Sequence, residues 1–206
     1  LAQVDDSMCF VYWQVTRGAS PRNHVYPENM PGKLWVMIRP EALPDPKVPL
    51  KLITLEDRRF AYGNVKTLNL MPAVKYSQEA LRAGVDEAVL HRDDVVTECA
   101  HSNVHILKGG VLYTHPNDEF ILRGIAKTRM VQMCHRESIP VIERAFTIDE
   151  MMGADEVLVT SSGNFLSFAD EVDGQPVGGK DPETLGRLRR AIYQDFIDYT
   201  GATDLF

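Results

Sequence analysis

The chain has 206 residues, of which 44% are hydrophobic and 25% charged, the ordinary composition of a globular protein with a sizeable core. Its formal net charge of −7 argues against a nucleic-acid or anionic-membrane partner, because both recruit basic surfaces. No apolar run approaches the roughly 20 residues of a membrane-spanning helix, and the first residues show no signal-peptide pattern.

Cysteine and histidine usage argues against a metal site. Cys9, Cys99 and Cys134 have no metal-ligand spacing, and their odd number favours free thiols in a reducing cytoplasm. His101 and His105 are four apart but lie in a predicted strand-and-turn region, where that spacing does not bring side chains together as it does on a helix. We therefore expect a cytoplasmic protein without a metal ion.

The first part of the chain predicts two strands, over 10–15 and 34–38, and the first of them is rich in aromatic and β-branched residues. Four prolines follow between positions 40 and 49, a density that is typical of a linker. The boundaries that follow are 1–42 for the end of a small domain, 43–49 for the linker and 50–206 for a large domain.

The rest of the chain predicts strands and helices in mixed order. Pro72 near the start and Gly84 past the end delimit one helix, because proline suits the first turn and glycine the position after the last. Thr147 and Glu150 have the spacing of a capping box, and Asp181 is an N-cap before a proline. The predicted strands are 50–55, 64–70, 87–90, 95–97, 103–107, 111–114 and 156–160, and the longer helices are 72–84, 124–139 and 182–199.

Lys66 is the most unusual residue of these elements, because it stands inside the apolar, strand-like run 64–70. Burial disfavours the charged form of a lysine and favours a neutral, nucleophilic amine, which characteristically forms a Schiff base with a carbonyl. The alternative is a lysine at a strand edge whose own stem reaches water. The run by itself does not decide between the two.

A Schiff-base lysine needs an electron sink, and the usual one is pyridoxal phosphate, whose ring nitrogen a carboxylate keeps protonated. Glu98 is the candidate, because it follows the apolar or β-branched residues 95–97 and is therefore poorly solvated. A glutamate in water at the end of a strand is the alternative.

The phosphate of such a cofactor needs an anion site. Gly124 and Ile125 open a predicted helix, whose first N–H groups attract anions. Ser161 and Ser162 offer hydroxyl groups and amides after a predicted strand. An ordinary serine–glycine turn is the alternative for the second segment.

Arg22 and His24 lie in a basic loop, 17–24, with a rigid turn at its centre. The planar fork of arginine suits a carboxylate, so this pair could hold the carboxylate of an amino-acid substrate. A solvated basic loop is the alternative.

Together, these segments resemble the fold-type-four pyridoxal phosphate enzymes, and within them the D-amino acid (D-alanine) aminotransferases. The lysine and glutamate segments are typical of the superfamily, and the Arg-x-His segment is typical of the D-amino acid branch. The segments that carry the resemblance are 11–24, 65–70, 87–92, 96–98, 102–103, 112–116, 121–125 and 159–162.

The resemblance implies a role for each candidate. Lys66 would form the Schiff base and move a proton between the substrate Cα and the cofactor, Glu98 would pair with the ring nitrogen, and Leu122 would pack against the ring. The phosphate would be held by Gly124, Ile125, Ser161 and Ser162.

The resemblance also implies a homodimer, in which Arg22 and His24 reach into the neighbouring subunit and bind the substrate carboxylate. The implied reaction transfers the amino group of a D-amino acid to a 2-oxo acid such as 2-oxoglutarate. The implied fold is α/β (α+β), with a mixed, twisted, barrel-like sheet in the large domain, the tail of a small α/β domain, and the cofactor between them.

Several alternatives remain open at this point. Family members have a further N-terminal segment with an arginine and a tyrosine of the site, and this chain, beginning at Leu1, is expected to lack it and to bind cofactor weakly or not at all. Ala126 replaces a threonine on the phosphate, and His101 adds bulk near the cofactor. The competing functions are a branched-chain L-amino acid aminotransferase, an aminodeoxychorismate lyase, an inactive truncated relative that keeps the fold and dimerises and, more remotely, a serine hydrolase built on Ser161 or Ser162.

Overall fold

The computed structural model describes residues 9–201, and the chain separates after Pro44 into two units. The first unit contains an antiparallel pair of strands, β1 (Cys9–Thr16) and β2 (Lys33–Pro40), in register from the Cys9–Pro40 pair to the Thr16–Lys33 pair. Both predicted strands are confirmed, and each is slightly longer than predicted. Most side chains of this ribbon are exposed, including its two tryptophans.

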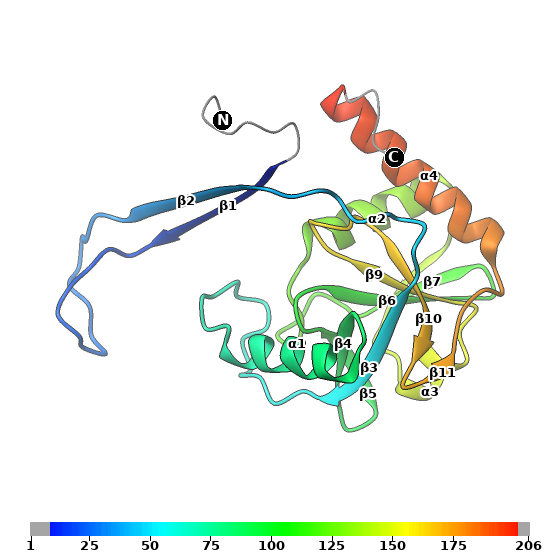
Figure 1. The fold of residues 1–206 in the computed structure, drawn as a ribbon, viewed down its shortest axis with the longest axis horizontal. Coiled ribbons are helices and arrows are strands. Elements are labelled where there is room, and N and C mark those ends of the chain that lie inside the picture. The colour runs from blue at the N-terminus through cyan, green and yellow to red at the C-terminus, as the bar shows by residue number, and fades with distance from the viewer. Residues whose placement is uncertain (1–8, 202–206) are drawn as a thin grey trace. The chain divides into compact units, whose positions relative to one another are not determined.

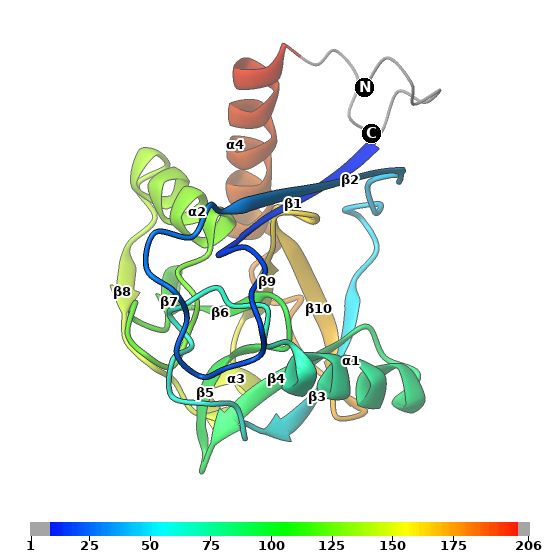
Figure 2. The same cartoon turned by 90° about the vertical axis from the view of Figure 1, so that its left-hand side faces the viewer.

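The second unit is built on one mixed sheet of nine strands in the order β5-β4-β3-β10-β9-β6-β7-β8, with β11 paired to β10. β3 runs parallel to β4 and β10, β7 runs parallel to β8, and the other pairs are antiparallel. The sheet is curled, as Figure 1 and the view at right angles in Figure 2 show. Its strands are β3 (Leu50–Glu56), β4 (Glu87–Arg92), β5 (Val95–Cys99), β6 (Asn103–Lys108), β7 (Val111–Thr114), β8 (Val141–Glu143), β9 (Glu156–Thr160), β10 (Ser167–Val172) and β11 (Gln175–Pro176).

Four helices are described in this unit, and they cover different parts of the sheet: α1 (Met71–Ala83), α2 (Ile125–Arg136), α3 (Ile148–Met152) and α4 (Pro182–Thr200). α1 packs on β3 and β4, while α2 packs on α4 and β8. Met130 and Met133 of α2 share one buried cluster with Leu185 and Leu188 of α4 and with Leu158 of the sheet. No described helix is long and apolar enough to cross a membrane.

Three of the predicted helix-end signals are confirmed. Gly84 ends α1 in the left-handed conformation with φ of 73°, which costs glycine little. Thr147 and Glu150 form the complete capping box of α3. The Asp181 side chain accepts a hydrogen bond from the backbone N–H of Thr184 at the start of α4. These signals are local, so they act whatever the rest of the chain does.

The prediction of a strand over 64–70 is wrong, and of the two alternatives for Lys66 the structure shows the exposed one. Residues 57–70 are irregular, and Lys66 and its apolar neighbours are exposed. The N–H groups of Val65 and Thr67 bond to carbonyls two or three residues back, so this backbone turns on itself instead of pairing with a strand. An apolar run is therefore no proof of burial at this position.

The prediction that α2 runs to Ile139 is also wrong, because the helix ends at Arg136. Ser138 adopts a left-handed conformation with φ of 56°, and the Ile139 N–H bonds back to the Cys134 carbonyl, which closes the helix. Three strands are present that the sequence pattern does not predict: β8, β10 and β11.

Candidate active site

The topology brings three strand ends together at one end of the sheet. The Cys99 N–H bonds to the Ser102 carbonyl at 2.8 Å, so a tight turn joins the end of β5 to the start of β6. Asn103 at the start of β6 is paired with Thr160 at the end of β9. Glu98 and the end of β9 are therefore both linked to Asn103, although about 60 residues separate them along the chain.

Glu98 is the centre of this site. Its side chain is buried, and its Oε2 accepts hydrogen bonds from Asn103 Nδ2 at 2.9 Å and from the Leu122 N–H at 3.0 Å. Its Oε1 lies 2.6 Å from Arg59 Nη1. Burial raises the pKa of Glu98, while the Arg59 guanidinium and the Leu122 N–H act in the opposite direction. Glu98 and Leu122, two of the predicted site residues, are thus in contact.

Arg59 is held by a second carboxylate. Its Nε lies 2.9 Å from Asp57 Oδ1, and its Nη2 lies 3.0 Å from Asp57 Oδ2, which is a bidentate pair. Although burial acts to raise the pKa of Asp57, the hydrogen bonds and charge of Arg59 hold it below its ordinary value. Neither residue is among those that the sequence patterns indicate. The signal in the sequence is two acids followed by two arginines, 56–59, directly after the predicted strand 50–55.

The start of α2 lies beside Glu98. Asn103 Nδ2 also donates to the Leu122 carbonyl at 3.0 Å, so one amide ties the 119–124 loop to Glu98. Gly124 is the N-cap of α2 and makes no side-chain cap, which leaves the first amides of the helix available to an anion. Ile125 in the first turn is 77% exposed. Gly124 and Ile125 therefore lie where an anion site is expected.

Gly124 has no room for a larger residue. A Cβ atom at this position would lie 2.1 Å from Asn103 Oδ1, so Gly124→Ala must displace the amide that holds Glu98. We expect the free energy of unfolding to fall by about 1–3 kcal/mol, as in other overpacked sites, and any ligand of the site to bind more weakly. Urea denaturation and ligand titration measure both effects.

Gly186→Ala on α4 is the matched control for that variant, because its Cβ would approach only the end of the Arg190 side chain, at 3.3 Å. Alanine is the better helix former, so this control is expected to keep or raise stability. Equal losses in the two variants would contradict the role given to Gly124.

The other predicted site residues have no hydrogen bond or ion pair with Glu98 among the described residues. Ser161 is half-buried and its Oγ accepts from the Asn164 N–H at 3.1 Å, while Ser162 is exposed. Lys66 is exposed in the 57–70 segment and makes no hydrogen bond or ion pair with a described residue. Arg22 and His24 are exposed in the first unit, in the loop between β1 and β2. The structure thus joins Glu98 to Leu122 and Gly124, but does not join Lys66 to them.

Exposed apolar side chains flank Lys66 along the chain, and we call them the Lys66 patch. Its seven side chains are each between 51% and 77% exposed, which is unusual for neighbours in one segment. The segment is anchored by the Gly63 N–H, which donates to the Glu119 carbonyl at 2.8 Å. The patch consists of Phe60, Tyr62, Val65, Leu68, Leu70, Met71 and Val74.

Two buried basic side chains stiffen the neighbouring loops. Lys127 on α2 is 1% exposed and donates from Nζ to the His115 carbonyl and to Asn117 Oδ1, and burial lowers its pKa. His105 on β6 bridges Thr114 and Thr160 through its two ring nitrogens. Burial lowers the pKa of His105 to about 3, so this ring is neutral at physiological pH.

Comparison with known proteins decides the family. The model of the family described as "Amino-transferase class IV" matches residues 2–170. The chain belongs to the class IV aminotransferases. It is 34% identical to the D-alanine aminotransferase of Bacillus licheniformis over 94% of this chain and 69% of the relative. It is 37% identical to that of Staphylococcus epidermidis over 92% of this chain and 67% of the relative. The resemblance drawn from the sequence is confirmed.

Solved structures show the same fold for this class IV aminotransferase. A fold IV transaminase from Curtobacterium pusillum matches with a TM-score of 0.77 and 19% identity, over 94% of this chain and 66% of that one. A branched-chain amino acid aminotransferase from Escherichia coli matches with a TM-score of 0.78 and 20% identity, over 95% of this chain and 66% of that one. The predicted mixed α/β fold is confirmed.

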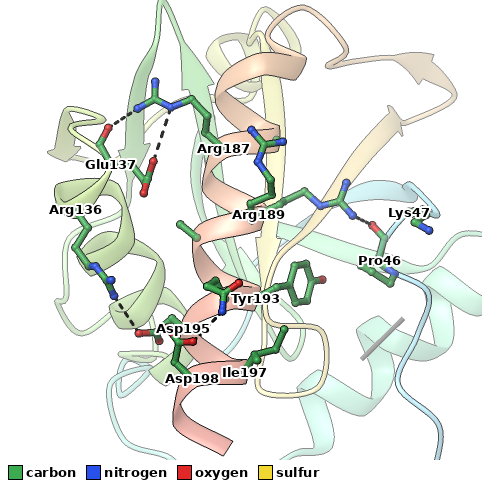
Figure 3. Close-up of a pocket in the computed structure, with 14 residues that line it drawn as sticks. Pro46, Lys47, Arg136, Glu137, Arg187, Arg189, Tyr193, Asp195, Ile197 and Asp198 are labelled. Carbon is green, nitrogen blue, oxygen red and sulfur yellow. Dashed lines mark hydrogen bonds and ion pairs between the residues drawn. The ribbon is translucent and has the colours of Figure 1, made fainter. Parts of the chain in front are cut away.

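A cavity of about 840 Å³ in this aminotransferase lies away from Glu98, between α4, the end of α2 and the segment at Pro46 (Figure 3). Two of its basic side chains have acidic partners, since Arg136 pairs with Asp195 and Arg187 lies near Glu137. None of the predicted site residues lines it. The arrangement around Glu98 is therefore the better candidate for the active site.

His101 follows the turn after Glu98, and the structure places its side chain largely in water. Its Nδ1 lies 2.8 Å from Glu87 Oε2, and this hydrogen bond raises the pKa of His101. The stability from this pair is therefore fully present below the unfolded-state pKa of about 6.5 and is lost as pH rises through the raised value. We expect His101→Gln to lower the free energy of unfolding more at about pH 6 than at about pH 9. Urea denaturation at both pH values tests this, and a pH-independent difference would contradict it.

Proposed function

We propose that this class IV aminotransferase uses pyridoxal phosphate to transfer the amino group of a D-amino acid, of the D-alanine type, to a 2-oxo acid such as 2-oxoglutarate. The observation that carries the proposal is the buried Glu98 carboxylate, held by Arg59, Asn103 and the Leu122 N–H beside the open start of α2. The D-amino acid specificity is supported by relatives at 34% and 37% identity that are named D-alanine aminotransferases.

The residues around Glu98 fit the cofactor in charge. Oε2 of Glu98 already accepts two hydrogen bonds, whereas Oε1 accepts one from Arg59, so one acceptor position remains for a protonated ring nitrogen. The first amides of α2 and the hydroxyl groups of Ser161 and Ser162 are the donors that a phosphate requires. When bound, pyridoxal phosphate supplies an electron sink for the substrate Cα.

The residues of this chain have distinct roles in the proposal. Lys66 would hold the cofactor covalently at its carbonyl carbon, with release of water, and would move a proton to and from the substrate Cα. Leu122 packs against the cofactor ring, and its N–H keeps Glu98 oriented. Arg22 and His24 bind the substrate carboxylate in the site of the neighbouring subunit, since a guanidinium fork matches a carboxylate.

We further propose that a second copy of this chain covers the Lys66 patch. Lys66 is exposed in the single chain, whereas a lysine that acts as a nucleophile needs a drier environment. The seven exposed apolar side chains of the Lys66 patch are the surface that a subunit contact buries. Burial of the Lys66 patch by a second subunit would therefore both hold the homodimer together and make Lys66 reactive.

Met71→Asp is expected to weaken this dimer about 10- to 100-fold, because it puts a charge in the apolar contact. Met71 is 77% exposed and stands at the first position of α1, where an acid suits the helix dipole, so the fold itself should not suffer. Sedimentation velocity over a concentration series measures the dissociation constant. Tyr199→Asp, at an 87% exposed position on α4, is the control. If both variants associate like the wild type, the patch is not the subunit contact.

Steady-state assays separate the candidate functions. The proposal expects D-alanine and 2-oxoglutarate to give pyruvate and D-glutamate, with no pyruvate in the absence of the acceptor. Reaction of L-amino acids alone would indicate a branched-chain aminotransferase, and release of pyruvate without an acceptor would indicate the lyase. A protein that stays colourless with added pyridoxal phosphate would be an inactive relative.

A further inference from the structure

Four alternating charges lead from the surface to Glu98. Arg92 Nε lies 3.5 Å from Asp57 Oδ2, Asp57 holds Arg59 through two hydrogen bonds, and Arg59 Nη1 lies 2.6 Å from Glu98 Oε1. The side chains of Arg92, Asp57, Arg59 and Glu98 are 31%, 0%, 17% and 7% exposed. The outer end of this charge chain is therefore hydrated, and the inner end is dry.

The guanidinium of Arg59 has no freedom to turn. Its Nε and Nη2 are held by Asp57, its Nη1 by Glu98, and its Nη2 also approaches the Phe120 carbonyl at 3.4 Å. A planar group held along two edges fixes the carboxylate that it contacts. Arg59 therefore determines where the remaining acceptor position on Oε1 of Glu98 points.

We propose that Arg59 is a positioning residue that keeps Glu98 ionised and aims its one free acceptor position at the ring nitrogen of the cofactor, and that Asp57 limits the positive charge that Arg59 presents. This inference rests on the proposed function. Arg59 touches neither of the reacting atoms in the proposal and acts through Glu98.

The charge of Arg59, shared between Asp57 and Glu98, determines how strongly Glu98 attracts a cationic ring nitrogen. Without Arg59, a buried Glu98 takes up a proton more readily and binds a cationic ring nitrogen poorly. Without the negative charge of Asp57, Arg59 would neutralise Glu98 more fully and weaken its attraction for the same nitrogen. Two further titratable groups interact with Glu98 among the described residues: the Lys127 amine from α2, and the Cys99 thiol, which stays neutral because burial raises its pKa.

The test is equilibrium binding of pyridoxal phosphate to the full chain, followed by absorbance over a range of pH. We expect Arg59→Met to weaken binding about tenfold or more at neutral pH and to move the acid limb of the binding profile upward by about one pH unit. Arg59→Lys keeps the charge but loses the fork, so it should weaken binding while leaving that limb close to the wild-type position. Asp57→Asn should weaken binding and move the limb downward, opposite to Arg59→Met.

Arg58→Met is the matched control, because Arg58 is the adjacent arginine, is 75% exposed and pairs with Glu56 at the surface. It is expected to bind like the wild type. Far-UV circular dichroism checks that each variant folds. If Arg59→Met does not fold, the binding profiles of Arg59→Lys and Asp57→Asn still test the role of Arg59. If all three variants bind pyridoxal phosphate as tightly as the wild type and with the same pH profile, the role of Arg59 is overturned. The proposed function is then left intact. If the wild-type protein itself takes up no cofactor, both the role of Arg59 and the proposed function are overturned.

Discussion

Replacing Lys66 by alanine is expected to abolish amino-group transfer, with a loss in kcat of about 10⁴-fold or more, because no other described amine has the role of the nucleophile and proton carrier. Cofactor should still bind, held by Glu98 and the phosphate site, but without a covalent bond. Treatment with borohydride followed by peptide mass spectrometry measures this directly, since the label should be found on Lys66 in the wild type and be absent from the variant.

Lys75→Ala is the control for this experiment. Lys75 lies on the neighbouring helix α1, is 70% exposed and is 3.8 Å from Glu79, an ordinary surface pair of little energetic value. It is expected to keep full activity and labelling. Label on another lysine, or activity that survives in Lys66→Ala, would show that position 66 is not the site of attachment and that its exposure in the single chain reflects its true environment.

Replacing Glu98 by glutamine is the second large effect that we expect. Arg59 would lose one of its two counter-ions in a buried site, and the free energy of unfolding should fall by about 2–4 kcal/mol. The ring nitrogen of a bound cofactor would lose the carboxylate that keeps it protonated, so kcat should fall by about 10²-fold or more. Urea denaturation, kcat and the cofactor absorbance spectrum report these effects separately.

Glu156→Gln is the matched control for Glu98→Gln. Glu156 is 1% exposed, and its carboxylate accepts hydrogen bonds from the Gly179 and Asp181 N–H groups, away from Arg59. It should lose stability but leave the cofactor spectrum unchanged. If both variants lose activity only in proportion to their loss of folded protein, Glu98 is a structural acid and does not act on the cofactor.

Much of the secondary structure follows from local chemistry. The caps at Gly84, Thr147 and Asp181 depend on a backbone conformation or a side-chain oxygen within a few residues, so they can be read without knowledge of the fold. The sequence also predicts the strands around Glu98 to within a few residues. Strand β8 has three residues and β11 two, and so short a segment carries too little pattern to be seen.

Some residues of the candidate site can likewise be predicted from the sequence, whereas others are known only from the fold. The sequence alone indicates Glu98, Leu122 and Gly124 as site residues and shows the family of the chain. Motifs and their spacing can be recognised from the order of the residues, without the fold. That Arg59 is held between Asp57 and Glu98 is a property of the fold, since the contact of Arg59 with Glu98 joins residues 39 apart.

The sequence by itself determined the family, the helix caps, most strands and the acid at the centre of the site. Only the tertiary structure decided that Lys66 lies in a turn with exposed apolar side chains flanking it along the chain, and that Arg59 holds Glu98. The physical reason is that burial and ion pairing depend on what packs against a residue from elsewhere in the chain or from another subunit. An apolar segment such as 64–70 is the same string of residues whether it faces a core, a partner or water.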